Sequence, residues 1–273
     1  MNSCGERLDN LIERTGFEST KRPGLLVSVR NVEEARVVAP DADILDVKDT
    51  DNGPLGRPNQ ETLVAIMRIF GSTSLTSVAL GEVVDNSPGQ IRDYLANPEL
   101  QNTVSFAKLG CSNLAGEADW KHVWRNRLSE IPDSIEPVAV AYADHMDANS
   151  PSIEEVIKFA SAMGLSKLLI DTFAKDGRCL FDYCSAKFLR HILNEADQLQ
   201  LEVVMAGSIT EMALPKVFAL GPKFVGVRGA VCEKQNRESN ITRKSYNQFI
   251  EKYNSDWSGF ADSNRPNRAS RIE

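Results

Sequence analysis

The feature that most constrains the fold of this chain is a regular alternation of short β-branched runs with longer amphipathic stretches. Such alternation is typical of βα units built around a parallel sheet. Eight runs have the length and composition of strands that are buried on both faces: Leu25–Val29, Ile44–Lys48, Leu75–Leu80, Val104–Leu109, Val138–Tyr142, Leu168–Asp171, Val203–Ala206 and Phe224–Arg228. Eight such units in 273 residues predict an α/β fold, a single-domain (β/α)8 TIM barrel. A doubly wound open sheet is the alternative, because a strand count separates the two architectures poorly.

Helical patterns lie between the expected strands. Asn31 stands where a side chain can accept a hydrogen bond from the first turn of the first helix. The segments 82–100 and 111–137 are longer than simple βα loops, so we expect extra helices there. The other expected helices are Val32–Val38, Glu61–Phe70, Ile153–Met163 and Ala186–Leu199.

The two ends of the chain differ from the central repeat pattern. We expect residues 1–20 to form an N-terminal extension, a helix that covers one barrel end, and residues 21–254 to form the barrel catalytic domain. Residues 255–273 have little periodicity and are expected to be a mobile tail. The first residues mix charges and lack the apolar region of a signal peptide, so a cytoplasmic location is expected.

Composition excludes several classes of partner. A formal net charge of −7 without a basic face argues against nucleic-acid binding. No apolar run approaches the length of a membrane span. Five cysteines form no CxxC pair, which predicts reduced thiols. We therefore expect a small-molecule partner, and a homo-oligomer is compatible with the sequence.

Charged residues interrupt three of the apolar strands near their ends. Asp46 and Lys48 are two residues apart in the second strand, so they share one face. Lys108 ends the fourth strand, Asp171 ends the sixth, and Lys175 follows four residues later. Alternate strands of a barrel contribute to one interior layer, and the carboxyl ends of the strands carry the active site. The sequence therefore predicts a catalytic pocket with three amines and two carboxylates.

Two interpretations of this charge cluster compete. One buried Asp–Lys pair is often structural, as a layer that holds the barrel together. Three lysines against two acids favour chemistry, because like charges in a dry site lower the pKa of an amine and a neutral amine is the nucleophile of Schiff-base reactions. The excess positive charge also suits a phosphorylated substrate.

The loops after the last two strands have the composition of a phosphate site. Gly207 and Ser208 follow the seventh strand, and Arg228 and Gly229 follow the eighth. Barrel enzymes often bind phosphate with these two loops. Glycine allows close approach of the backbone, and arginine offers a charged fork. Arg228 has an alternative role, as the partner of a barrel carboxylate.

Other candidate residues carry less information. The three histidines have no metal-ligand spacing. Schiff-base chemistry on a lysine requires no metal and no cofactor, so neither is expected. Asp144 and His145 follow the fifth strand and are candidates for the pocket mouth. The segment from Gly53 to Gly56 lacks nucleotide-binding spacing and is better interpreted as a turn at the rim.

Seven motifs together resemble the (5-formylfuran-3-yl)methyl phosphate synthase family over roughly residues 25–232. They are Leu25-Leu-Val-Ser-Val29, Asp46-Val-Lys-Asp49 with Gly53-Pro-Leu-Gly56, Ala107-Lys-Leu-Gly110, Asp171-Thr-Phe-Ala-Lys-Asp-Gly177, Leu180-Phe-Asp182, Ala206-Gly-Ser-Ile209 and Val225-Gly-Val-Arg-Gly-Ala230.

The resemblance implies a lyase that condenses two glyceraldehyde 3-phosphate molecules, with loss of one phosphate and two waters, in the biosynthesis of methanofuran-type cofactors. It implies that Lys48 forms the Schiff base, that Lys108 accepts protons, and that Asp46, Asp171 and Lys175 complete the pocket. Two alternatives remain open: another class I aldolase or isomerase acting on triose or sugar phosphates, and a barrel that binds a phosphorylated metabolite without catalysis.

Overall fold

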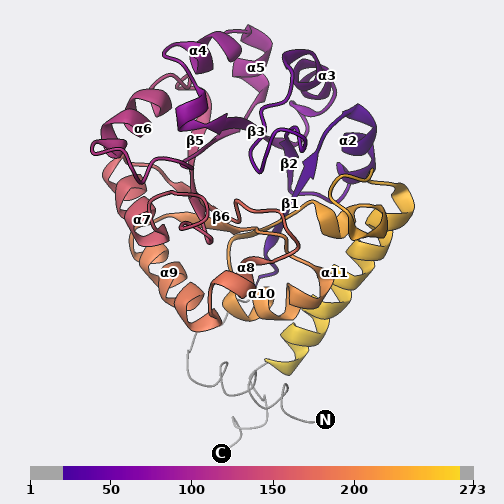
Figure 1. The fold of residues 1–273 in the computed structure, drawn as a ribbon. Coiled ribbons are helices and arrows are strands. Elements are labelled where there is room, and N and C mark those ends of the chain that lie inside the picture. The colour runs from indigo at the N-terminus through magenta and orange to yellow at the C-terminus, as the bar shows by residue number, and fades with distance from the viewer. Residues whose placement is uncertain (1–20, 265–273) are drawn as a thin grey trace, which may run out of the picture.

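Eight parallel strands follow one another in chain order around a closed barrel, and β8 pairs back onto β1 (Figure 1). The structure is a computed structural model and describes residues 21–264. Its strands are β1 (Gly24–Val29), β2 (Ile44–Val47), β3 (Leu75–Glu82), β4 (Phe106–Gly110), β5 (Glu136–Tyr142), β6 (Lys167–Asp171), β7 (Glu202–Met205) and β8 (Phe224–Val227). The predicted TIM barrel is confirmed, and the open sheet is excluded because every strand has two neighbours.

Helices surround the barrel on its outer face (Figure 1). They are α2 (Val32–Val38), α3 (Gln60–Phe70), α4 (Gln90–Tyr94), α5 (Pro98–Thr103), α6 (Trp120–Leu128), α7 (Ile153–Ala162), α8 (Leu180–Tyr183), α9 (Ala186–Gln198), α10 (Leu214–Leu220) and α11 (Arg243–Ser263). Four short 3-10 turns are η1 (Val83–Asp85), η2 (Glu211–Ala213), η3 (Gly229–Val231) and η4 (Glu233–Gln235). The extra helices expected in 82–100 and 111–137 are α4, α5 and α6, and Asn31 caps α2 as predicted.

The strand register sets the height of each interior side chain. Asp46 of β2 is level with Ser28 of β1 and with Ser77 of β3. Lys108 of β4 is level with Val138 of β5. Because side chains alternate along a strand, Asp46 and Lys108 point into the barrel interior, and both line the cavity at the carboxyl ends.

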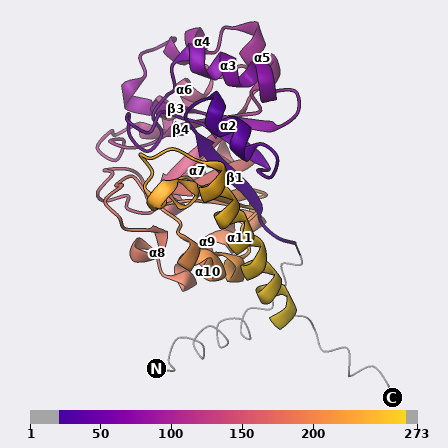
Figure 2. The same ribbon diagram turned by 90° about the vertical axis from the view of Figure 1, so that its right-hand side faces the viewer.

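The C-terminal helix α11 corrects the predicted boundary of the barrel. It continues through residues 255–263, which were expected to belong to a mobile tail. Tyr253 and Trp257, four residues apart and so on one helix face, lie with their ring centroids 5.2 and 5.6 Å from that of Phe218 on α10. These aromatic contacts hold the helix against the barrel, beside α10 and α2 (Figure 2). Because the segment is polar overall, its spaced aromatic residues did not indicate a helix in the sequence.

Two expectations lie outside the described residues: the helix in residues 1–20 and the remaining tail in residues 265–273. In the part of the chain that the structure describes, no helix is long and apolar enough to cross a membrane.

Candidate active site

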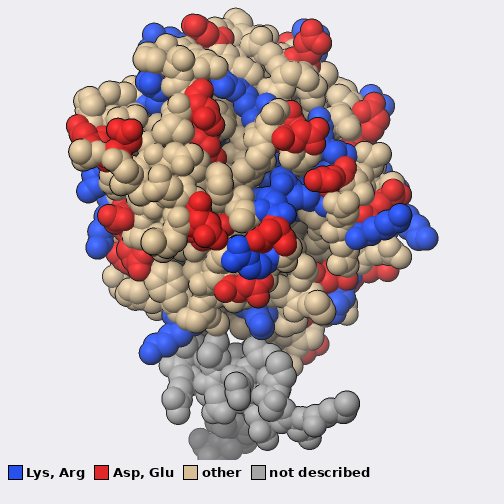
Figure 3. All heavy atoms as spheres, in the orientation of Figure 1, with Lys and Arg blue, Asp and Glu red and all other residues tan. Residues whose placement is uncertain are grey.

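A cavity of about 270 Å³ opens at the carboxyl ends of the strands. Its walls come from β1, β2, β4 and β6 and from the loops that follow β6, β7 and β8. The space-filling view along the barrel shows Lys and Arg side chains gathered near the middle of this face (Figure 3). A volume close to 300 Å³ is at the lower end of ligand pockets and suits a small metabolite.

Asp46 and Lys108 form a buried ion pair in the floor of this pocket. Their side chains are 1% and 4% exposed, and Lys108 Nζ contacts Asp46 Oδ1 directly. Ser28 Oγ donates a hydrogen bond of 2.8 Å to the other oxygen, Oδ2. Burial alone would raise the pKa of Asp46, but Lys108 and Lys48 outweigh it and hold that pKa below its usual value. Asp46 is therefore a carboxylate that can accept a proton only transiently.

Lys48 follows β2 and is almost fully buried. Its Nζ donates a hydrogen bond of 3.2 Å to the carbonyl of Pro54, in the loop after β2. Burial lowers the pKa of Lys48 to about 7, although Asp171 and Asp46 both act to raise it. Lys108 and Lys175 add to the lowering. A large share of this amine is therefore neutral and nucleophilic near pH 7.

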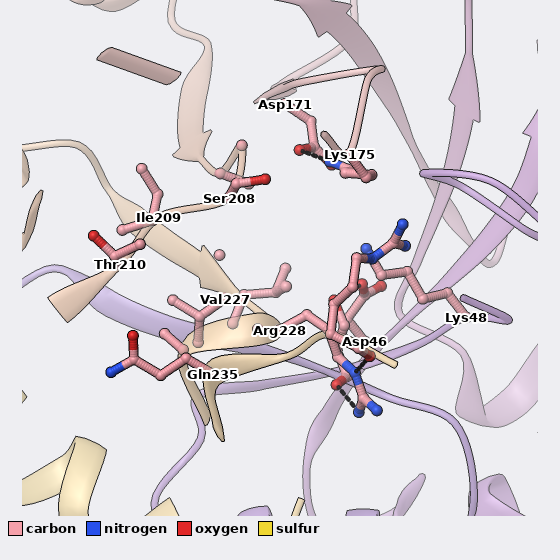
Figure 4. A pocket seen from close by; sticks show the side chains of 18 of the residues that line it. Asp46, Lys48, Asp171, Lys175, Ser208, Ile209, Thr210, Val227, Arg228 and Gln235 are labelled. Carbon is pink, nitrogen blue, oxygen red and sulfur yellow. Dashed lines mark hydrogen bonds and ion pairs between the residues drawn. The ribbon is translucent and has the colours of Figure 1, made fainter. Parts of the chain in front are cut away.

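Asp171 and Lys175 form a second ion pair at the end of β6. Lys175 Nζ lies 2.8 Å from Asp171 Oδ1, and it also donates to the carbonyl and hydroxyl of Thr172 at 2.6 and 3.2 Å. Burial would raise the pKa of Asp171, but Lys175 and Lys48 lower it. Figure 4 shows this pair on a different side of the cavity from Asp46 and Lys48. All five charged residues predicted for the catalytic pocket thus line the same cavity.

Gly207, Ser208 and Gly229 lie in the wall formed by the β7 and β8 loops. Gly207 has φ +96°, and a Cβ there would lie 3.0 Å from a methyl carbon of Thr172, so a side chain would be both strained and crowded. Ser208 has φ +50°, which is uncommon for a residue other than glycine. Among the described residues, no acceptor is found for the amide N–H groups of Gly207, Ser208 and Gly229. This wall is therefore suited to bind an anion through its backbone.

The guanidinium of Arg228, which lines the cavity, makes its hydrogen bonds within the protein. Two hydrogen bonds of 2.5 and 3.0 Å join it to Glu34, and three more of 2.9–3.1 Å go to the carbonyls of Ser28, Arg237 and Ser239. A guanidinium has five N–H donors, and these contacts use all five. The alternative role of Arg228 as partner of a barrel carboxylate is therefore confirmed, and its assignment as a phosphate-binding side chain stays a prediction.

Glu34 is the carboxylate that the sequence did not reveal. It lies in the first turn of α2 with its side chain 2% exposed. Burial would raise its pKa, but the hydrogen bonds and charge of Arg228 hold the pKa below its usual value. Glu34 follows β1 and Arg228 follows β8, so only the closure of the barrel brings them together.

Arg237 lines the pocket and was missed in the sequence. It lies nine residues beyond Arg228, past the 3-10 turns η3 and η4. At that distance from the strand end, the sequence position does not indicate whether a residue reaches the pocket. Its Nη2 donates a 3.4 Å hydrogen bond to the carbonyl of Gly53 in the rim turn after β2.

Asp144 positions the loop that carries Lys175. Its two carboxylate oxygens accept the amide N–H groups of Phe173 and Ala174 at 2.7 and 2.8 Å. Neither Asp144 nor His145 is among the residues that line the cavity. In residues 21–264, no group of three His, Cys, Asp or Glu side chains is arranged to hold a metal ion.

Comparison with known proteins gives consistent matches over the barrel. Residues 25–250 match the family described as 4-HFC-P synthase. The (5-formylfuran-3-yl)methyl phosphate synthase of Methanopyrus kandleri is 31% identical over 226 residues, which cover 81% of this chain and 94% of the relative. That of Methanocaldococcus jannaschii is 31% identical over 219 residues, with 79% and 92% covered.

Solved structures agree in fold at low identity. Phosphoribosyl anthranilate isomerase from Thermotoga maritima superposes with a TM-score of 0.59 at 14% identity, covering 85% of this chain and 99% of that one. The 3-hexulose-6-phosphate synthase from Salmonella typhimurium gives 0.56 at 12%, covering 84% and 99%. At these identities the likeness is one of fold alone.

Proposed function

Because the chain belongs to the 4-HFC-P synthase family, we propose that it condenses two glyceraldehyde 3-phosphate molecules into (5-formylfuran-3-yl)methyl phosphate through a Schiff base on Lys48. The relatives' names supply the product. The observation that carries the mechanism is the buried amine of Lys48, whose pKa is lowered to about 7 within the pocket. A neutral amine adds to an aldehyde, whereas a protonated amine has no free electron pair.

The proposed reaction begins with attack of Lys48 Nζ on a triose carbonyl and loss of water to give an iminium. The iminium withdraws electrons, so a proton can leave the adjacent carbon and an enamine forms. Lys108 and Asp46, which contact each other in the pocket floor, are placed to move this proton between carbon and the leaving oxygens.

The enamine expels the phosphate of the first triose from C3, and C2 of the second triose, after loss of its proton, adds to that carbon. The oxygen on C2 of the first triose then closes the ring onto the aldehyde carbon of the second, loss of two waters gives the furan, and hydrolysis of the imine returns the amine of Lys48. The water released when the imine forms is taken back at this step. Two trioses therefore give one furan phosphate, one phosphate and two waters.

Lys175 and Asp171 balance charge on the opposite wall, where Lys175 can reach a hydroxyl or phosphate oxygen of the substrate. The amide groups of Gly207, Ser208 and Gly229 would hold one phosphate. Their unused donors support this role. The scheme needs no metal and no organic cofactor.

The decisive experiment is incubation of the purified protein with glyceraldehyde 3-phosphate, followed by ultraviolet absorbance and mass spectrometry. A conjugated furan absorbs in the near ultraviolet, whereas aldol and isomerisation products of trioses do not. Borohydride added during turnover should reduce the iminium and leave an adduct on the peptide that contains Lys48.

The other outcomes identify the alternatives. An aldol or isomerised sugar phosphate without the chromophore would replace the furan synthase by another class I enzyme. An adduct confined to Lys108 or Lys175 would move the nucleophile. Binding of the substrate without any product would leave a phosphometabolite-binding barrel.

A further inference from the structure

Arg237 lies in the wall of the cavity with most of the donors of its guanidinium unused by the described residues. Its side chain is half-buried in the wall of the cavity. Only one hydrogen bond of its guanidinium is found in residues 21–264, the 3.4 Å contact with the carbonyl of Gly53. No carboxylate of this part of the chain lies within 4.0 Å of it. Most of its five donors therefore have no acceptor.

The neighbouring charges in the pocket are already neutralised. Lys108 is paired with Asp46, and Lys175 is paired with Asp171. The amine of Lys48 is about half neutral near pH 7. Among the described residues, Arg237 is consequently the cation of this lining that stays fully charged without a carboxylate within 4.0 Å.

The rim turn after β2 fixes the side of the pocket to which Arg237 reaches. Gly53 accepts from Arg237, and the next residue, Pro54, accepts from Lys48 Nζ at 3.2 Å. The amine of Lys48 and the guanidinium of Arg237 are thus both hydrogen-bonded to the dipeptide Gly53-Pro54. Figure 4 shows Lys48 on the opposite side of the cavity from Ser208. The guanidinium of Arg237 is therefore linked, through Gly53, to the turn that also holds Lys48.

The backbone of Arg237 is held rigidly, which presents its side chain in a fixed direction. Arg228 donates to the carbonyl of Arg237 at 3.1 Å and to that of Ser239 at 2.9 Å. Gly229 packs against the same segment, since a Cβ there would lie 3.7 Å from the amide nitrogen of Arg237. A positioned fork with unused donors is the arrangement with which proteins recognise phosphate oxygens.

We propose that Arg237 forms a second phosphate subsite, on the Lys48 side of the pocket, that binds the phosphate of the second triose phosphate. The identity of this ligand rests on the proposed function. Condensation of two phosphorylated trioses brings two phosphate groups into one cavity, and the backbone amides of the β7 and β8 loops accommodate one. Arg237 and the adjacent turn at Gly53 supply the other.

The test uses glycerol 3-phosphate, a phosphorylated three-carbon compound that has no carbonyl and forms no imine. Calorimetric titration of the full chain should show two sites, and Arg237→Gln should weaken one of them on the order of ten- to a hundredfold. Arg237→Lys keeps the charge but loses the planar, two-pronged guanidinium, so its affinity for glycerol 3-phosphate should lie between those of the wild type and Arg237→Gln. Arg92→Gln, an exposed residue of α4, removes the same charge far from the pocket and should bind as the wild type does.

The opposite results are equally clear. One site in the wild-type protein, or two unchanged sites in Arg237→Gln, would overturn the second subsite. A lower Tm with unchanged affinity would also overturn it, because Arg237 would then only tether the rim turn. Product analysis of the wild-type protein decides the proposed function separately, since the titration involves no turnover.

Discussion

Lys48 is the side chain whose protonation should control the rate of iminium formation, and pH is the perturbation that tests this. With a pKa of about 7, about half of the amine is neutral at pH 7, against about 4 in 10,000 for an unperturbed lysine with a pKa of about 10.4. The structure thus accounts for a gain of more than about a thousandfold in available nucleophile. Between pH 6 and pH 8 the neutral fraction should rise about tenfold and then level off.

The assay is a pulse of substrate at each pH, followed by quenching into borohydride at one fixed pH. Mass spectrometry then gives the initial rate of adduct formation on Lys48. Lys175→Met should move the midpoint upward for two reasons: it removes a cation that lowers the pKa of Lys48, and it frees the charge of Asp171, which raises that pKa. Lys187→Met, an exposed residue of α9, is the matched control and should leave the midpoint near 7.

One outcome would refute the reasoning. A rate that keeps rising tenfold per pH unit up to pH 9 would mean that Lys48 has an ordinary pKa. The burial that lowers its pKa would then be relieved by water in solution, and another group would have to supply the nucleophile.

Three further predictions concern the same pocket. Lys48→Arg should abolish turnover and leave Tm nearly unchanged, because arginine stays protonated and forms no imine; near-normal turnover would make Lys48 a structural charge. Arg228→Ala should lower the free energy of unfolding by about 3–5 kcal/mol, measured by urea denaturation, since it leaves Glu34 buried without its partner; a loss below about 1 kcal/mol would show that the pair is not buried in solution. EDTA should leave activity intact, because the iminium takes the place of a Lewis acid; loss of activity that one divalent ion restores would contradict this.

Much of the fold could be predicted because its signals are local. The barrel strands are mostly apolar runs, and Asp46, Lys108 and Asp171, which interrupt three of them, line the pocket. Asp46 and Lys48 could be placed on one face from their spacing alone. The end of the barrel could not be placed, because the periodic aromatic residues of α11 lie in a segment whose overall composition is polar.

The two arginines of the β8 loop show where inference from sequence position fails. The general rule that barrels bind phosphate after the last strand points to this loop, but the residue next to the strand is Arg228, whose five donors are taken by Glu34 and three carbonyls. Only barrel closure brings that glutamate within reach, across 194 positions in the sequence. The pattern of each strand taken separately does not predict this contact between the first and last βα units.

Arg228 nevertheless bears on ligand binding through the backbone that it holds. Its contacts with the carbonyls of Arg237 and Ser239 fix the segment that carries the unpaired guanidinium. Loss of Arg228 should therefore reduce stability directly and phosphate affinity indirectly, whereas loss of Arg237 should reduce affinity alone. If the two variants weakened phosphate binding equally at unchanged Tm, both guanidinium groups would have to touch the ligand. The two hydrogen bonds from Arg228 to Glu34 would then have to break, which would leave a buried carboxylate without a partner and cost more free energy than the phosphate contact returns.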